Sequence, residues 1–337
     1  MSNIYFLEKY KDANIYIKRE DLHPFSFGGN KVKIAQEIFA DMEERGFTSV
    51  ISFGSPTSNM NRAIAHMAAA KGIPCHVILK VEEDQGGDRG EMPMNERLVR
   101  ESGAHIQECS PANVRETVER VMAAAKDAGE NPYYIYGDST GHGNEEVLMR
   151  AYGKQYWPIR EYEREQGIRF HDIFLPVGTA ATISGLMASV SEGCEVDEPQ
   201  IRLHGISIAR KKEAVEEAIR RFLGSCGYDT PTCLGLTDIT DAYLEGGYGR
   251  AKNAENAENT ENAENIEGNE AGAGSKSPVH QLIEEKMRTL GLPLDPVYTG
   301  KAYYGMLREI DRLSLAGDIL FIHTGGTPLF FDYWRSR

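Results

Sequence analysis

The stretch that decides the fold is Gly28-Gly29-Asn30-Lys31-Val32, a glycine-rich turn that carries a single lysine. The preceding Tyr16-Ile17-Lys18 is typical of a β-strand, and the apolar residues of 34–39 recur at helical spacing. This pattern predicts that Lys31 lies in the first turn of a helix, where the helix dipole disfavours a cation. The ammonium should therefore lose its proton more easily, which suits an amine that attacks a carbonyl group. A solvated lysine at a helix start is the alternative, and this motif alone does not decide between the two.

A second segment is typical of a phosphate-binding loop. Gly178-Thr179-Ala180-Ala181-Thr182 directly follows the apolar run 173–177 and precedes the helix-like residues 183–190. Backbone N–H groups converge at the start of such a helix, and small side chains let an anion approach closely. Because small-residue turns follow strands in many α/β proteins, this loop is weak evidence when taken alone.

A third segment could hold a carboxylate. Ser58-Asn59-Met60-Asn61-Arg62 follows the strand-like run 48–53 and opens a helix that continues through Met67. Exposed N–H groups at this helix start, together with the Ser58 hydroxyl, could bind an anion. Ser58 is also a good N-cap for any helix, so an ordinary cap is the alternative.

The composition limits the class of protein. The chain has 337 residues, of which 41% are hydrophobic and 26% are charged, and it is long enough for two domains. A net charge of −14 argues against binding to nucleic acid or to anionic membranes. The 5 cysteines lack paired spacing, which predicts reduced thiols rather than disulfides or a metal site. No signal peptide or apolar run of about 20 residues is present, so we expect a cytoplasmic protein without a membrane segment. Because the cysteines lack the spacing of a metal site, we also expect no bound metal.

Short apolar runs alternate with helical patterns along the chain. Predicted strands cover 48–53, 75–81, 105–107, 133–136, 173–177, 203–208 and 319–323, and predicted helices cover 61–71, 94–102, 112–128 and 211–223. This alternation predicts an α/β fold with βαβ units and largely parallel sheets.

Residues 251–278 interrupt this pattern with a near-perfect Ala-Glu-Asn triplet repeat. The segment has almost no apolar residue to bury, which predicts a disordered acidic insertion. A role as an acidic docking segment is the less favoured alternative.

Taken together and in this order, the motifs identify a resemblance. The chain resembles the pyridoxal-phosphate (PLP) enzymes of the 1-aminocyclopropane-1-carboxylate (ACC) deaminase and D-cysteine desulfhydrase family, from Lys18 to about Tyr333. Besides the segments above, the resemblance rests on Lys18-Arg19-Glu20-Asp21, on Asp295-Pro296-Val297-Tyr298-Thr299-Gly300-Lys301-Ala302 and on Ile322-His323-Thr324-Gly325-Gly326-Thr327-Pro328.

The resemblance implies a two-domain fold of the tryptophan-synthase-β type (PLP fold type II). A large cofactor-binding domain would comprise 1–43 and 158–337, with the acidic insertion 251–278 inside it. A small substrate-binding domain would comprise 44–157, and the cofactor would lie in the cleft between the two. A homodimer is usual in the family.

The resemblance also implies the site residues. Lys31 would carry PLP and then act as a base. Asn59 would contact the ring hydroxyl oxygen, and residues 178–182 would hold the phosphate without an arginine. The implied catalytic residues are Lys31, Ser58, Tyr298 and Tyr248; the implied cofactor-binding residues are Lys31, Asn59, Gly178, Thr179, Ala180, Ala181, Thr182 and Thr299; the implied substrate-binding residues are Thr57, Ser58, Asn59 and Met60.

Some positions depart from the family pattern. Met60 and Asn61 follow Ser-Asn where other residues are usual, Lys33-Ile34 replaces an Arg-Lys pair, and Ala180 and Ala181 replace glycines. Thr299 stands where cyclopropane-opening members have a glutamate that faces the pyridine nitrogen. A neutral hydroxyl would leave the ring a weaker electron sink.

The neutral Thr299 favours α,β-elimination from a small β-substituted amino acid, similar to D-cysteine desulfhydrase, with release of a keto acid and ammonia. The other departures limit this conclusion, because they include substrate-facing positions. A PLP-dependent β-replacement transferase similar to cysteine synthase and an ACC deaminase are alternatives. A non-catalytic homologue that binds an amino acid is an alternative of another class. The substrate and its chirality stay open.

Overall fold

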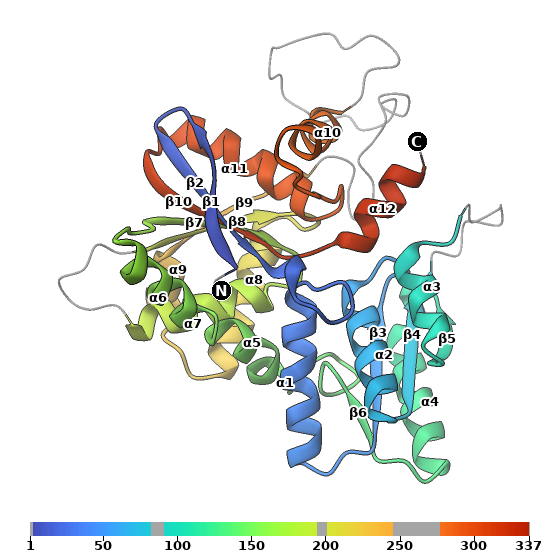
Figure 1. The fold of residues 1–337 in the computed structure, drawn as a ribbon. Coiled ribbons are helices and arrows are strands. Elements are labelled where there is room, and N and C mark those ends of the chain that lie inside the picture. Colours follow the sequence, from blue (N-terminus) through green and yellow to red (C-terminus); the bar gives the residue numbers. More distant parts are fainter. Residues whose placement is uncertain (1–2, 82–90, 194–200, 245–276, 337) are drawn as a thin grey trace.

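The computed structural model describes residues 3–81, 91–193, 201–244 and 277–336 (Figure 1). The strands are β1 (Ile4–Tyr10), β2 (Ala13–Arg19), β3 (Ser49–Gly54), β4 (Cys75–Lys80), β5 (His105–Cys109), β6 (Pro132–Tyr134), β7 (Asp172–Val177), β8 (Arg202–Ser207), β9 (Thr237–Thr240) and β10 (Gly317–His323). The α-helices are α1 (Asn30–Glu44), α2 (Asn59–Lys71), α3 (Met94–Glu101), α4 (Val114–Asp127), α5 (Glu145–Gly153), α6 (Tyr156–Gln166), α7 (Ala181–Gly193), α8 (Lys212–Ser225), α9 (Thr230–Gly235), α10 (Pro278–Leu290), α11 (Thr299–Leu313) and α12 (Thr327–Arg335).

The larger sheet is built from both ends of the described chain. Its strand order is β1-β2-β10-β7-β8-β9, and β1 is antiparallel to β2 while the remaining pairs are parallel. The N-terminal and C-terminal segments meet where β10 pairs with β2 over Gly317–His323. Helix α7 is buried from Ala181 to Val190, as expected for a central helix that is apolar on all sides.

The smaller sheet uses the middle of the chain. Its order is β5-β4-β3-β6, and all its pairs are parallel. Helix α1 connects the two sheets and buries Val32, Ile34, Ala35 and Ile38 against the main hydrophobic core. In Figure 1 the two sheets form separate parts of the molecule, with α1 running along the smaller one.

The C-terminal helix α12 lies against the part of the molecule that contains the smaller sheet. Both carboxylate oxygens of Asp332 accept the N–H of Met94 at the start of α3, at 3.0 and 2.9 Å. This contact ties the chain end to the smaller sheet and fixes one side of the boundary between the sheets (Figure 1).

The predicted fold class, an α/β fold with largely parallel sheets, is confirmed, and each predicted strand overlaps a strand of the structure. Strands β1 and β9 and helices α5, α6, α9, α10 and α12 were not among the predicted elements. The domain boundaries at 44 and 158 stay a prediction. Within the described ranges, no helix is long and apolar enough to cross a membrane.

The predicted acidic insertion falls mostly outside the described residues, which end at 244 and resume at 277. Its predicted C-terminal boundary at 278 is wrong by two residues. The Ser277 side chain accepts the N–H of His280 at 3.3 Å and caps α10, which begins at Pro278. Serine before a proline at the first helical position is a strong helix start.

Candidate active site

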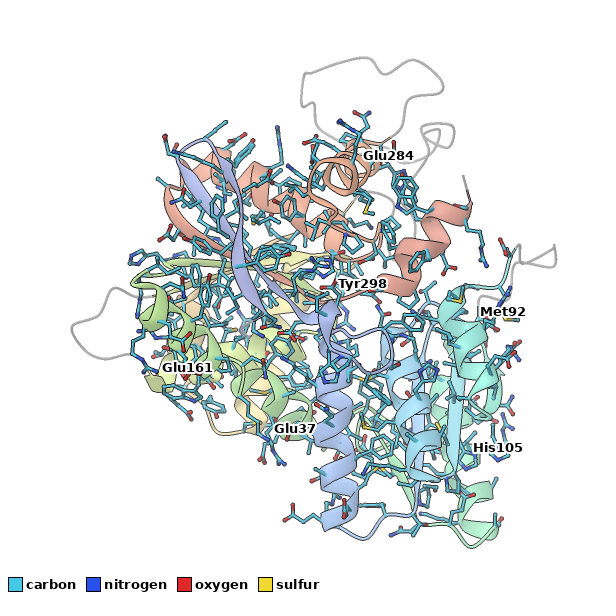
Figure 2. All side chains as sticks on the ribbon, in the orientation of Figure 1. Glu37, Met92, His105, Glu161, Glu284 and Tyr298 are labelled. Atoms are coloured by element: carbon cyan, nitrogen blue, oxygen red, sulfur yellow. The ribbon has the colours of Figure 1, made fainter. Side chains whose placement is uncertain are left out.

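A cavity of about 560 Å³ lies where the carboxyl ends of strands from both sheets meet. Lining residues follow or end β3, β4 and β6 of the smaller sheet, and others follow β7, β8 and β10 of the larger sheet. Ligands of α/β proteins collect at such strand ends, because loops and helix N-termini converge there. Figure 2 labels Tyr298, a lining residue, near the middle of the molecule, whereas Glu37, His105 and Glu161 lie at its edges.

Lys31 lies in the first turn of α1 and lines the cavity, as the sequence predicted. Burial lowers the pKa of its amine from 10.5 to about 8. The direction agrees with the prediction, but the physical cause is desolvation of the ammonium rather than the helix dipole. A lysine with this pKa has a substantial fraction of free amine near neutral pH and suits nucleophilic attack.

The glycine turn before Lys31 packs tightly against the loop after β10. A side chain at Gly325 would place its Cβ 2.5 Å from the Gly29 Cα, and one at Gly28 would place its Cβ 2.3 Å from the Asp21 carbonyl oxygen. These glycines have φ between 64° and 108°, which other residues rarely adopt. The Asn30 N–H donates to the Thr324 carbonyl oxygen at 2.8 Å, which fixes the start of α1 at the end of β10.

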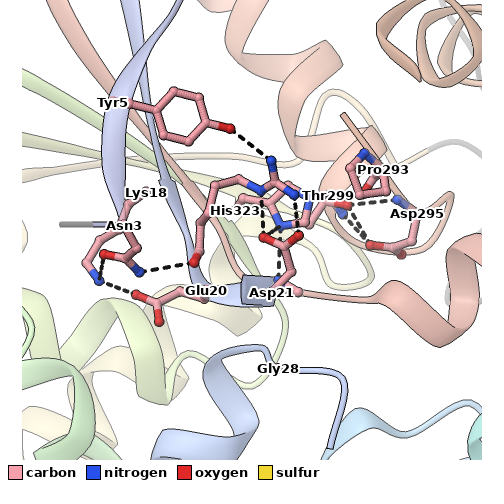
Figure 3. Close-up of polar contacts among 12 residues, drawn as sticks. Asn3, Tyr5, Lys18, Glu20, Asp21, Gly28, Pro293, Asp295, Thr299 and His323 are labelled. Carbon is pink, nitrogen blue, oxygen red and sulfur yellow. Dashed lines mark hydrogen bonds and ion pairs between the residues drawn. The ribbon is translucent and has the colours of Figure 1, made fainter. Parts of the chain in front are cut away.

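A buried polar network lies between this turn and the larger sheet (Figure 3). Arg19 donates to both carboxylate oxygens of Asp21, at 2.8 and 2.6 Å. The Asp21 carboxylate also lies 3.2 Å from His323 Nδ1, and its interactions with His323 and Arg19 hold the pKa of Asp21 below its usual value against the effect of burial. His323 Nε2 contacts the Pro293 carbonyl oxygen at 3.0 Å. His323 is therefore a buried strand-end residue that joins the turn to β10, and it does not line the cavity.

The predicted phosphate loop lines the same cavity as Lys31, from Gly178 to Thr182. Residues 181–183 form the first turn of α7, and their N–H groups donate to no acceptor among the described residues. The Asn30 side-chain amide donates to the Thr182 hydroxyl at 3.0 Å, which joins the starts of α1 and α7. Ala180 has φ 73°, an unfavourable conformation for alanine, so the loop holds a shape that a glycine would adopt with less strain.

The predicted carboxylate-binding segment forms the N-terminus of α2. The Ser58 hydroxyl accepts the N–H of Asn61 at 3.2 Å, so Ser58 is a true N-cap. The N–H groups of Asn59 and Met60 have no acceptor within the described ranges, and both residues line the cavity. Thr57 does not line the cavity; its carbonyl oxygen accepts from Asn95 at 2.8 Å, and Ser55 lines the cavity beside it instead.

Asn95 on α3 is a site residue that the sequence analysis missed. It is fully buried, and its amide donates to the Asn59 side-chain oxygen at 3.0 Å. Because that oxygen is occupied, the Asn59 side chain presents its NH₂ group as the donor that remains for a ligand. The contact joins residues far apart in sequence, so no local pattern indicates it.

Tyr298 lines the cavity, but Thr299 does not lie where the resemblance placed it. Thr299 is fully buried, and its hydroxyl donates to Asp295 at 2.6 Å and accepts the Asp295 N–H at 2.8 Å. The Asp295 carboxylate accepts N–H groups of residues 297–299 and caps the start of α11, while burial raises its pKa. The hydroxyl residue beside Tyr298 in the lining is Thr324, which the sequence analysis quoted only as part of a motif.

The structure brings most of the predicted site residues into one cavity. Those that line it are Lys31, Ser58, Asn59, Met60, Gly178, Thr179, Ala180, Ala181, Thr182 and Tyr298. Thr57 and Thr299 are absent from the lining, and Tyr248 lies outside the described residues.

These residues fit PLP. An amine with a lowered pKa could bind its aldehyde, and the unpaired N–H groups at the start of α7 could bind its phosphate. The oriented Asn59 amide could donate to the ring oxygen, and Tyr298, Thr324 and Gly325 would surround the ring.

The pKa of Lys31 predicts how the apoprotein captures the cofactor. The rate of PLP capture should rise with pH and reach half its maximum near pH 8, because the free amine forms as the pH passes its pKa. At pH 7 the free-amine fraction is roughly 300-fold larger than for an ordinary lysine. Since the folded-state pKa lies below the unfolded-state value, apoprotein stability should also rise between pH 8 and 10.5. Stopped-flow absorbance measures the rate of PLP capture at each pH. A capture rate that reaches half its maximum near pH 10 would contradict the lowered pKa of Lys31.

Comparison with known proteins agrees with this site. The family described as "Pyridoxal-phosphate dependent enzyme" matches residues 4–325. The D-cysteine desulfhydrase of Klebsiella pneumoniae is 28% identical over 340 residues, covering 97% of this chain and 91% of that protein.

Two solved structures have the same fold. The crystal structure of an ACC deaminase homologue superposes with a TM-score of 0.74 at 23% identity, covering 99% of this chain and 92% of that chain. An O-ureido-L-serine synthase superposes with a TM-score of 0.63 at 14% identity, covering 100% of this chain and 96% of that chain. The match to residues 4–325 shows that this chain belongs to the family of PLP-dependent enzymes, with the type II fold.

Proposed function

We propose that this enzyme catalyses α,β-elimination from a small β-substituted amino acid and releases a keto acid and ammonia. The observation that carries the proposal is the composition of the cavity. Lys31, the start of α2 and Tyr298 line one space, and Glu145 is the only carboxylate among the described lining residues. The desulfhydrase relative supports the proposal, since it matches nearly the whole chain at 28% identity.

The substrate would bind through its carboxylate at the start of α2. The N–H groups of Asn59 and Met60 would donate to it, and the Ser58 hydroxyl is close enough in sequence to add a third contact. Asn95 would hold Asn59 in place, because it occupies the side-chain oxygen. The apolar Met60 side chain would limit the size of the substrate.

The proton steps would belong to Lys31 and Tyr298. Bound PLP supplies an electron sink for the charge left on the α-carbon. The Lys31 amine would take the α-proton, because its pKa of about 8 allows both protonation states near neutral pH. The Tyr298 hydroxyl would donate a proton to the group that leaves the β-carbon. Tyr248 would join the site only if its segment reaches the cavity.

The Asp295–Thr299 contact would act indirectly. Thr299 and the N–H groups at the start of α11 hold Asp295, and this cap fixes the backbone of Tyr298. Thr324 and Gly325 would therefore face the ring in place of Thr299, and neither carries a charge.

The β-replacement transferase stays the second candidate on the same scaffold. Product analysis distinguishes elimination from replacement. The enzyme is incubated with each enantiomer of β-chloroalanine or cysteine, and for a reactive enantiomer it should release one keto acid per ammonia. Addition of a thiol should leave keto-acid release unchanged if elimination dominates. Formation of a thioether amino acid at the expense of keto acid would favour replacement, and no reaction with either enantiomer would contradict both.

We also propose a cytoplasmic homodimer of this enzyme. The four described cysteines are free thiols, and three of them, Cys75, Cys109 and Cys233, are almost completely buried. Reduced cysteines are typical of the cytoplasm. Sedimentation of the purified protein tests the dimer.

A further inference from the structure

Besides Lys31, the described cavity lining contains three cations that the proposed reaction does not use. Lys31, Lys80, Arg210 and Arg221 line the cavity, and Glu145 is the only acidic residue among its described lining residues. This excess of positive charge is local, because the whole chain carries a net charge of −14. A cavity that collects cations in an acidic protein is suited to an anionic ligand.

Arg210 lies beside the phosphate loop because of the sheet register. Strands β7 and β8 are parallel, with Val177 opposite Ser207, and the Ile208 N–H donates to the Val177 carbonyl oxygen at 3.1 Å. The residues that follow both strands therefore emerge at the same edge, and Arg210 lines the cavity together with Gly178. The Arg210 side chain makes no hydrogen bond or ion pair with the described part of the chain, so its guanidinium is available.

Arg221 lines the cavity from α8, which packs on the helix α7 that follows the phosphate loop. Its Nε lies 3.9 Å from Glu145 Oε1, a distance at the limit of an ion pair. The other Glu145 oxygen accepts the N–H of Gly143 at 2.7 Å. The remaining guanidinium donors of Arg221 are therefore free to bind a second acceptor.

The cofactor's phosphate needs more positive charge than the loop provides. A phosphate monoester carries about −1.5 to −2 charges at neutral pH, whereas a helix N-terminus supplies roughly +0.5. Helix α1 adds no other cation to the lining, because Lys31 binds the aldehyde and position 34 is a fully buried isoleucine. Asn30 contributes only a neutral amide.

We propose that Arg210 and Arg221 bind the phosphate of PLP from the α8 side of the loop at 178–182. This proposal differs from the expectation that the loop holds the phosphate without an arginine. The inference depends on the PLP dependence of the family and not on which reaction the enzyme catalyses.

Cofactor affinity tests the proposal without turnover. Apoprotein with Arg210→Ala or Arg221→Ala should bind PLP roughly tenfold more weakly, and the double variant more weakly still, because each charge-assisted contact is lost. Affinity for pyridoxal, which lacks the phosphate, should stay within twofold in every variant. Raising the salt concentration should weaken PLP binding to the wild type more than to the double variant.

Two neighbouring cations provide matched controls. Arg220→Ala removes an arginine beside Arg221 that pairs with Glu216 at 3.2 Å, and Lys211→Ala removes an exposed lysine beside Arg210. Neither residue lines the cavity, and both variants should bind PLP like the wild type. The variant Arg210→Lys/Arg221→Lys should recover part of the affinity because it keeps the charge.

Three outcomes would overturn the proposal. One is a double alanine variant whose PLP affinity stays within twofold of the wild type. If the KM of that variant for an acidic substrate rises, the two arginines bind the substrate and not the cofactor. Another is an equal loss of affinity for pyridoxal and PLP, which would indicate a structural role. The third is an equal loss in the Arg220 and Lys211 controls, which would indicate only a general charge effect.

Discussion

Replacing Lys31 with alanine should abolish turnover, with a loss of roughly 10⁴-fold or more, because in the proposed mechanism this residue both holds the cofactor and moves the α-proton. The variant should still bind PLP non-covalently, since the N–H groups at the start of α7 do not depend on the lysine. Borohydride treatment followed by peptide mapping measures covalent attachment. It should label Lys31 in the wild type and leave the variant unlabelled.

Lys80 provides the matched control, because it is the second lysine that lines the cavity and it lies at the end of β4 in the smaller sheet. Lys80→Ala should keep both borohydride labelling and the visible absorbance of bound cofactor. Labelling of Lys80 in the wild type, or retained turnover in Lys31→Ala, would contradict the assignment of Lys31.

The sequence predicted those parts of the site that depend on local patterns. Lys31 lies in the first turn of α1 because glycines precede it and apolar residues follow at helical spacing. The loop at 178–182 and the cap at Ser58 are also short segments between a strand and a helix. The strands with continuous apolar runs, such as β7 and β10, were predicted because both of their faces are buried.

The remaining features depend on contacts between distant residues. Strand β1 lies at the sheet edge and mixes polar with apolar residues, so its pattern does not indicate a buried strand. Asn95 acts through Asn59, and the lowered pKa of Lys31 comes from the walls of the cavity. Thr299 is absent from the cavity lining, because its hydroxyl bonds to Asp295 four residues earlier, whereas Thr324 is present in it. A motif gives the order of residues but not the direction of each side chain.

The last prediction is that elimination exceeds ring opening. Release of keto acid from β-chloroalanine should be faster than deamination of ACC by about 100-fold. A carboxylate beside the pyridine nitrogen would raise the pKa of that nitrogen by roughly 1–3 units relative to a neutral hydroxyl, and without it the protonated ring is correspondingly rarer. Tyr298, Thr324 and Gly325 line the cavity and carry no carboxylate, so a ring bound beside them, as we propose, would keep its nitrogen largely unprotonated. Opening an unactivated cyclopropane requires the protonated ring, which withdraws electrons more strongly than the unprotonated ring.

Tyr298→Phe separates this electronic argument from the role of the hydroxyl. If the hydroxyl acts mainly in the transition state, the variant should lower kcat by at least tenfold for a poor leaving group while KM changes little. The loss should be smaller for chloride, because a good leaving group needs no proton. Asp295 caps α11 through backbone N–H groups that the substitution leaves intact, so the helix start should hold its position. If ACC proves the better substrate of the wild type, the argument from the uncharged ring end is wrong, and a carboxylate from outside the described residues must reach the ring.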